Sequence, residues 1–126
     1  MLIRRAEEIP GSVVTMPGAS SVEMRMMVGR SDGAPNFAMR HFTVSPGGHT
    51  PRHSHNYEHE VFIVSGEGTT EADGNLYRIR EGDVVFVPAN VTHQFVNTGR
   101  EALRFLCLVP LNFDCAGECM PVPGSG

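Results

Sequence analysis

Three of the six histidines fall within seven residues of one another, and imidazole is a common ligand of transition metals. His53 and His55 are two positions apart, so on an extended strand both side chains leave the same face. His59 follows after Asn56 and Tyr57, where the chain can turn, and it opens the apolar run of a returning strand. These three imidazoles can therefore converge on one point.

The fourth candidate ligand, His93, lies in a second ordered stretch, residues 82–97, where glycine, proline and asparagine fix the backbone. Four neutral nitrogen donors on rigid strands suit one divalent first-row transition metal, and all-imidazole sites accept manganese, iron, zinc, nickel or copper. Four protein donors around an octahedral ion leave two positions open. Open coordination is the mark of a catalytic metal rather than a structural one.

Other acidic and imidazole side chains compete for these roles. Glu58 and Glu60 flank His59 and are rival ligands, but on an extended strand their side chains leave the opposite face. We interpret His41 and His49 as structural or surface residues, although His49 is close enough in sequence to reach the rim of a pocket. The expected ligand set therefore stays at four histidines.

Length and composition limit the classes of protein that fit this chain. With 126 residues, we expect one domain with its own hydrophobic core. The net charge of −4 and ten scattered basic residues argue against nucleic acid or a lipid surface as a partner. No apolar run approaches the roughly 20 residues that cross a bilayer. The chain starts without a cleavable leader pattern, and its three cysteines cannot all pair, so we expect a cytoplasmic location.

Short alternating segments between glycines and prolines predict an all-β domain. The 14 glycines and 9 prolines leave few windows long enough for a helix. Asp73-Gly74 is a strong signal for a two-residue hairpin. Residues 101–109 include helix formers, but the run is short and ends at Pro110, so we predict a strand. About nine to eleven strands are expected in an antiparallel sandwich or barrel, beginning with residues 2–4.

The barrel domain is placed at residues 1–112 and a C-terminal tail at 113–126. We expect Cys115 and Cys119 in this tail to be exposed or half-buried thiols, with a conditional disulfide or a packing contact as alternatives. Cys107 is interpreted as a small buried hydrophobe, with an oxidisable thiol beside the metal as the alternative. Strand parity assigns four candidates for the pocket wall: Ile63, Phe95, Phe105 and Cys107.

Two ordered motifs resemble the signatures of the cupins. Gly47-x5-His53-x-His55-x3-His59-x6-Gly66 is similar to the first signature and Gly82-x5-Pro88-x-Asn90-x2-His93-x3-Asn97 to the second. His59 stands where most cupins carry a glutamate ligand. Asn90 stands where the second signature usually has glycine, a mild change because asparagine tolerates left-handed backbone. The flanks APNFAMR and FLCLVP look like those of small single-domain bacterial and archaeal cupins with four histidine ligands, a group associated with manganese.

The resemblance implies a jelly-roll β-barrel, usually dimeric, with one divalent metal inside and manganese as the first choice. We expect a metal-dependent oxygenase, specifically a dioxygenase, that acts on a small organic substrate with O2. Two alternatives stay open: a Lewis-acid isomerase, decarboxylase or hydrolase acting on a small acid, and a module that binds a metal or metabolite without turnover. Arg40 and Arg52 are interpreted as solvated, with contact to an acidic substrate as the alternative for one of them.

Overall fold

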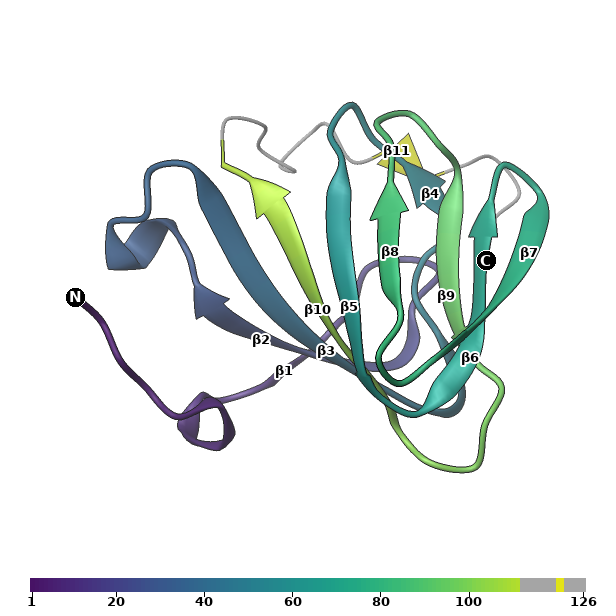
Figure 1. Cartoon of the computed structure of the whole chain (residues 1–126), viewed down its shortest axis with the longest axis horizontal. Helices are drawn as coiled ribbons and strands as arrows, with labels where there is room; N and C mark the ends of the chain where they lie inside the picture. Colours follow the sequence, from purple (N-terminus) through teal and green to yellow (C-terminus); the bar gives the residue numbers. More distant parts are fainter. Residues whose placement is uncertain (112–119, 122–126) are drawn as a thin grey trace.

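In the part of the chain that the structure describes, eleven strands of two to 13 residues carry the fold (Figure 1). The computed structural model describes residues 1–111 and 120–121. The strands are β1 (Ser12–Val13), β2 (Ser20–Val28), β3 (Phe37–His49), β4 (His53–Ser54), β5 (His59–Ser65), β6 (Glu67–Ala72), β7 (Asn75–Arg80), β8 (Val84–Val87), β9 (His93–Asn97), β10 (Leu103–Pro110) and β11 (Met120–Pro121). Two single 3-10 turns accompany them, η1 (Ala6–Glu8) and η2 (Arg30–Asp32). Among the described residues, no helix is long and apolar enough to cross a membrane.

The strands form one antiparallel sheet that curls into a jelly-roll barrel, as predicted. The main path of the sheet runs β11-β4-β9-β3-β10-β5-β8, with β1 and β2 added beside β3 and the β6–β7 hairpin added beside β9. The long strand β3 pairs with β2 and β10 and reaches β9 where His49 lies opposite Val96. A register shift between Arg104 and Phe105 interrupts the β5–β10 ladder, and such irregularities bend a sheet. This curl turns one face of every long strand toward a common interior.

Turn chemistry fixes the register of the β6–β7 hairpin. Asp73 and Gly74 have φ angles of 47° and 90°, and Ala72 lies opposite Asn75 across the turn. Both central residues therefore have the positive φ that a type I′ turn requires. The side chain of Asp73 also accepts a hydrogen bond of 2.9 Å from the backbone N–H of Thr92. The hairpin prediction is confirmed.

The last barrel strand, β10, begins two residues later than predicted and contains helix-forming residues. It lies between β3 and β5 and pairs with both along most of its length. Its burial alternates, with Leu103, Phe105 and Cys107 buried and Arg104 exposed. Pairing on both edges and a period of two therefore override the helix propensity of single residues.

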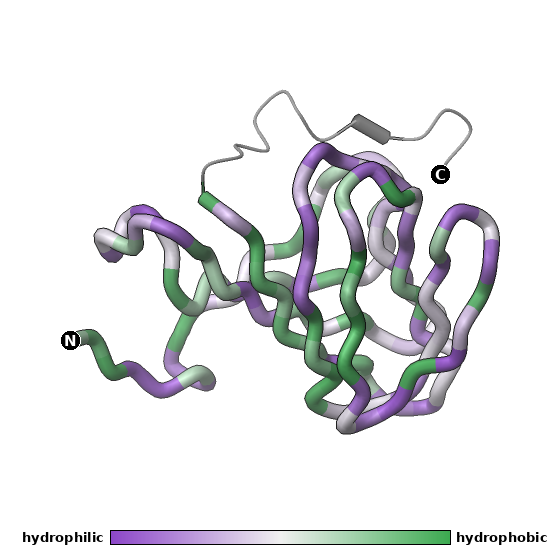
Figure 2. Tube along the Cα trace, turned by 45° about the horizontal axis from the view of Figure 1, so that its top comes forward, coloured by the Kyte–Doolittle hydropathy of each residue, from purple (hydrophilic) through white to green (hydrophobic). Residues whose placement is uncertain are grey.

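Phe105 lies at the centre of the hydrophobic core. Its ring stacks on Phe95 with a centroid distance of 4.7 Å and on Phe42 with a distance of 5.2 Å. Val44 and Leu103 belong to the same cluster and have no exposed surface. Figure 2 shows hydrophobic stretches along the strands of the barrel, and the buried members of these stretches form the core.

The two ends of the chain differ from the prediction. Residues 2–4 form no strand, Ile3 is 86% exposed, and Figure 1 shows the N-terminal segment leading away from the barrel. A strand needs a partner, and the first ladder forms instead between β1 and β2, so the prediction for residues 2–4 is wrong. Cys115 and Cys119 lie outside the described residues. Of the tail, β11 is described, and it pairs with β4.

Candidate metal centre

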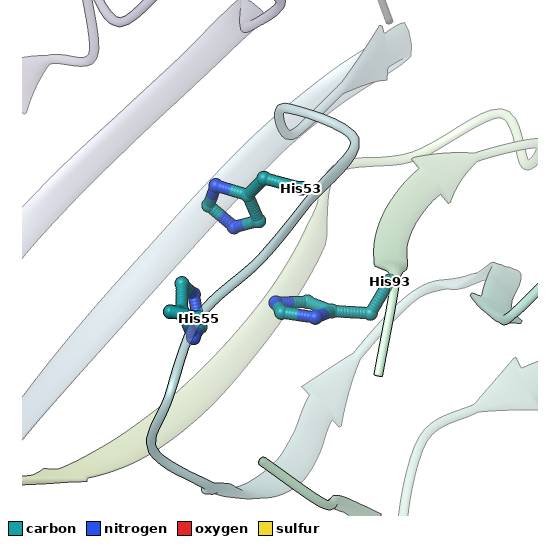
Figure 3. Close-up of side chains that lie close together, drawn as sticks. All are labelled: His53, His55 and His93. Atoms are coloured by element: carbon teal, nitrogen blue, oxygen red, sulfur yellow. The ribbon is translucent and has the colours of Figure 1, made fainter. Parts of the chain in front are cut away.

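Three histidines converge at one end of the barrel interior (Figure 3). His53 lies on β4, directly opposite His93 on β9, and His55 is the first residue after β4. One nitrogen from each of the three side chains lies within 4.8 Å of the others. Figure 3 shows the three rings pointing toward one another. The fold therefore brings the histidines of the two sequence motifs to a single point.

His59, the fourth expected ligand, begins β5 and lies beside this trio. Its Nε2 atom is 3.2 Å from Nε2 of His55, and its ring centroid is 5.0 Å from that of His93. Two nitrogens bound to one ion at ~2.1 Å would lie about 3.0 Å apart at a right angle and about 3.4 Å apart at the tetrahedral angle. The spacing of His55 and His59 falls in this range. The compact group is thus His53, His55 and His93, and His59 approaches it through His55.

The hydrogen bonds of the rings leave nitrogens free for a cation. Nδ1 of His93 lies 2.9 Å from the carbonyl oxygen of Val91 and donates to it, so Nε2 keeps its lone pair. That Nε2 is buried and has no hydrogen-bond partner among the described residues, and the same holds for Nδ1 of His53. Buried polar atoms are nearly always paired. The orphaned Nε2 of His93 faces the other two rings in Figure 3 and therefore fits a bound metal ion, whereas Nδ1 of His53 points away from them.

Burial keeps these imidazoles neutral, which is the state that a metal requires. The pKa of His53 is lowered to about 3 and that of His55 to about 4, chiefly by loss of solvation and then by the neighbouring His93. Loss of solvation also lowers the pKa of His59 and of His93, and the positive charge of Arg40 acts in the same direction on both. All four rings are therefore lone-pair donors at neutral pH.

The cluster opens into a cavity of about 190 Å³. Three of the predicted wall residues, Phe95, Phe105 and Cys107, line this cavity. Ile63, the fourth, does not line it and is wholly buried in the core. Parity placed Ile63 on the inner face of β5, but it lies four residues beyond His59, about 13 Å along the strand. The cavity ends before that point.

Several wall residues were not identified from the sequence. Tyr57 was assigned to a turn, yet it is buried and its ring stacks on His55 with a centroid distance of 4.2 Å and an interplanar angle of 4°. The sequence does carry one indication of this role, because Tyr57 lies between the candidate ligands His55 and His59. Val14 and Met16 also line the cavity, from the segment between β1 and β2. Nothing in their local pattern links them to the histidines, because only the curled sheet brings them there.

Cys107 connects the histidine cluster to Arg40. Its Sγ atom lies 3.3 Å from Nδ1 of His59 and accepts a hydrogen bond of 3.3 Å from Nη2 of Arg40. If Nε2 of His59 binds a cation, Nδ1 must carry the ring proton. Nδ1 then donates a hydrogen bond to the sulfur of Cys107. Burial raises the pKa of the Cys107 thiol, against the opposing effect of Arg40. Cys107 thus orients a candidate ligand as well as filling space.

The rival ligands lie away from the cavity. Glu58 is exposed and Glu60 is half-buried, and neither lines the cavity. Loss of solvation, and then a hydrogen bond with Glu58, raise the pKa of Glu60 to about 7. The two carboxyl groups therefore interact with each other rather than with the histidine cluster. His41 and His49 are half-buried on β3 and do not line the cavity either.

The curled antiparallel barrel and its buried histidine cluster define a small all-β protein with a candidate metal centre inside. The family model described as a cupin domain, Cupin_2, matches residues 40–109. The chain therefore belongs to the Cupin_2 family. The matched region holds all four candidate ligands together with Arg40 and Cys107.

Proteins similar to this chain differ in the activities that their names describe. The oxalate-binding protein of Thermotoga maritima is 31% identical over 116 residues, which cover 88% of this chain and 94% of that protein. The 1-methylthio-D-xylulose 5-phosphate methylsulfurylase of Rhodospirillum rubrum is 37% identical over 71 residues, 56% of this chain and 46% of that protein. The structure of the polyketide cyclase RemF from Streptomyces resistomycificus matches with a TM-score of 0.82 and 30% identity, covering 87% of this chain and 79% of that one. This range of names fits a scaffold that hosts many reactions.

Proposed function

We propose that this protein is a metal-dependent oxygenase that uses manganese or iron and O2 to oxidise a small organic substrate. The observation that supports this best is a cluster of imidazoles, with an unpartnered Nε2 on His93, at the edge of a largely apolar cavity. Among the described residues, no aspartate or glutamate lines that cavity. The site therefore offers ligands for a metal but no carboxylate to act as a general base.

Each residue of the site has a role in this proposal. His53, His55, His59 and His93 would hold the ion, and a bound manganese or iron would supply Lewis acidity and the redox chemistry with O2. Phe95 and Phe105 present apolar rings to the cavity and exclude water from it. Cys107 fixes the orientation of His59 through Nδ1. The protein thus positions and shields the reacting groups.

Oxygen uptake is the direct test. Protein purified without a histidine tag and loaded with Mn²⁺ or Fe²⁺ is given a panel of phenols, alkenes, diketones and small acids. We expect O2 consumption with at least one member of the panel and its loss after the metal is removed by a chelator. Electron paramagnetic resonance on the same samples reports whether the metal has nitrogen ligands. A flat oxygen trace with every member, in both metal forms, would exclude the oxygenase.

Chemistry without oxidation is the second candidate, and the similar proteins favour it. Neither the polyketide cyclase nor the oxalate-binding protein has a name that describes an oxidation. The same histidines would then hold a Lewis acid for isomerisation, decarboxylation or hydrolysis of a small acid, or a metal that binds a ligand without turnover. Zinc separates the candidates because it has no redox chemistry. Turnover by the zinc-loaded protein would favour this second candidate.

Replacing His59 by glutamate should retain the metal and weaken the binding of anions. Four neutral imidazoles leave a divalent site with a net charge of about +2, whereas three imidazoles and one carboxylate leave about +1. Titration of azide or oxalate into the metal-loaded proteins measures the difference. The conservative variant His59→Gln, which adds no negative charge, is the matched control. Tighter anion binding by His59→Glu than by the wild type would contradict the charge argument.

We propose that the protein works in the cytoplasm as a homodimer, as its cysteine content and its resemblance to cupins imply. Phe62 on β5 and Val84 on β8 lie opposite each other, with 45% and 77% of their surface exposed. Contiguous exposed apolar side chains of this kind mark interaction surfaces. Phe62→Glu should lower the mass measured by light scattering to that of a monomer, whereas Leu76→Glu on β7 should not. A monomeric wild type at micromolar concentration would contradict the dimer.

A further inference from the structure

Arg40 is a cation in the cavity wall, and it has no carboxylate partner within the described part of the chain. It lies on β3, directly opposite Cys107 on β10, and it lines the cavity together with the four histidines. The structure pairs other arginines with acidic residues, and Arg52 is one of them, since its Nε and Nη2 atoms donate to Glu71 at 2.7 and 2.9 Å. Arg52 is therefore not free to bind a substrate, and of the two arginines singled out in the sequence only Arg40 faces the cavity.

The hydrogen-bonding capacity of Arg40 is largely unused. A guanidinium carries five N–H donors in a planar fork. Nη2 donates to the sulfur of Cys107, a weak acceptor, and Cζ lies 5.1 Å from the centroid of the Phe42 ring. Nε is buried and has no hydrogen-bond partner among the described residues. Arg40 is half-buried, and a buried donor such as its Nε is costly unless an acceptor completes it.

We propose that Arg40 binds the carboxylate of the substrate, so that the protein acts on small organic acids. A carboxylate accepts two parallel hydrogen bonds from a guanidinium and so matches its fork. One part of this inference rests on the proposed function: a metal held by the histidines would bind another oxygen atom of the same acid. The carboxylate contact itself depends on Arg40 and the cavity alone.

The size and charge of the cavity narrow the class further. Its volume of about 190 Å³ equals that of about six water molecules in the liquid, at ~30 Å³ each. This space suits an acid of a few carbon atoms better than a nucleotide or a polycyclic substrate. With neutral imidazoles, Arg40 and a divalent ion would together place a formal charge of about +3 around the cavity, which an anion offsets. Short dicarboxylates and oxo-acids combine the required size, charge and oxygen donors.

Calorimetric titration with malonate, and with malonamide as its neutral counterpart, tests the proposal on zinc-loaded and metal-free protein. The variants are Arg40→Met, Arg40→Lys and, as the matched control, Arg78→Met on the exposed face of β7. We expect Arg40→Met to weaken malonate binding about 10- to 100-fold, with malonamide and the zinc content unchanged. Arg40→Lys should lose several-fold, because an ammonium keeps the charge but not the fork. Arg78→Met should bind malonate like the wild type.

The outcomes separate this inference from the proposed oxygenase. If no substrate consumes O2 but malonate binding still depends on Arg40, the carboxylate site stands and the oxygenase does not. If malonate binding disappears with the metal and is unchanged in Arg40→Met, the metal alone binds the acid and the inference is overturned. If Arg40→Met fails to fold, the malonate affinity of Arg40→Lys tests the inference instead. Wild-type affinity for malonate in Arg40→Lys would also overturn the inference.

Discussion

Replacing His55 by alanine should strip the protein of nearly all its bound metal. His55 is the central ring of the cluster, with centroid distances of 4.6 Å to His53, 4.6 Å to His59 and 4.8 Å to His93. Removing a residue that hydrogen-bonds to a metal ligand lowers metal affinity about 10- to 100-fold. Removing a ligand itself should lower the affinity further. Elemental analysis of the purified protein measures the occupancy, and titration of Zn²⁺ into the metal-free protein measures the affinity.

His41→Ala is the matched control for this experiment. His41 is a half-buried histidine on β3, and it does not line the cavity. The His41→Ala variant should therefore bind as much metal as the wild type. Thermal melts of the metal-free proteins show whether His55→Ala still folds. A folded His55→Ala variant with full metal content would refute the assignment of His55 as a ligand.

Replacing Phe105 by alanine should cause a large loss of stability, about 3–5 kcal/mol in the free energy of unfolding. Only 2% of the Phe105 surface is exposed, and its ring packs between those of Phe42 and Phe95. The substitution removes both stacking contacts and leaves a void that joins the cavity, because Phe105 also lines the cavity. Urea denaturation of the metal-free protein measures the loss without a contribution from metal binding.

Phe37→Ala provides the comparison, because Phe37 begins β3 and has 59% of its surface exposed. Its loss should change the free energy of unfolding by less than about 1 kcal/mol. If Phe105→Ala and Phe37→Ala destabilised the protein equally, Phe105 could not hold the central position in the core. In the folded fraction of Phe105→Ala, the larger cavity should also admit bulkier acids than the wild type does.

The features that could be predicted from the sequence are those set by local rules. The hairpin at Asp73-Gly74 follows from the φ angles that its turn requires, and the left-handed backbone tolerated by asparagine is present at Asn90, with a φ of 69°. The convergence of His53 and His55 follows from the period of a strand. The spacing of two residues on a strand and the type of a turn residue both determine local backbone geometry. These features can therefore be predicted without knowledge of the tertiary structure.

The features that could not be predicted depend on contacts between distant segments. Arg40 is 67 residues from Cys107 in the chain, and only the pairing of β3 with β10 shows that its guanidinium faces the cavity rather than solvent. The pairing of Arg52 with Glu71 was equally hidden, because it depends on the position of β6 in the sheet. Two arginines with similar local surroundings thus have opposite roles, and the fold decides between them.

The walls of the cavity differ in how firmly they are anchored. Most wall residues lie on or next to long strands with extended ladders, but Val14 and Met16 follow β1, which pairs with β2 at two positions only. A backbone hydrogen bond of 2.9 Å from the N–H of Val14 to the carbonyl of Val22 ties this stretch to β2, and one of 3.0 Å from the N–H of Ala19 to the carbonyl of Met16 closes a turn within it. Local opening is cheapest where few hydrogen bonds must break. This stretch is therefore the part of the cavity wall, away from the histidines, where we expect local opening to cost least and a small molecule to enter.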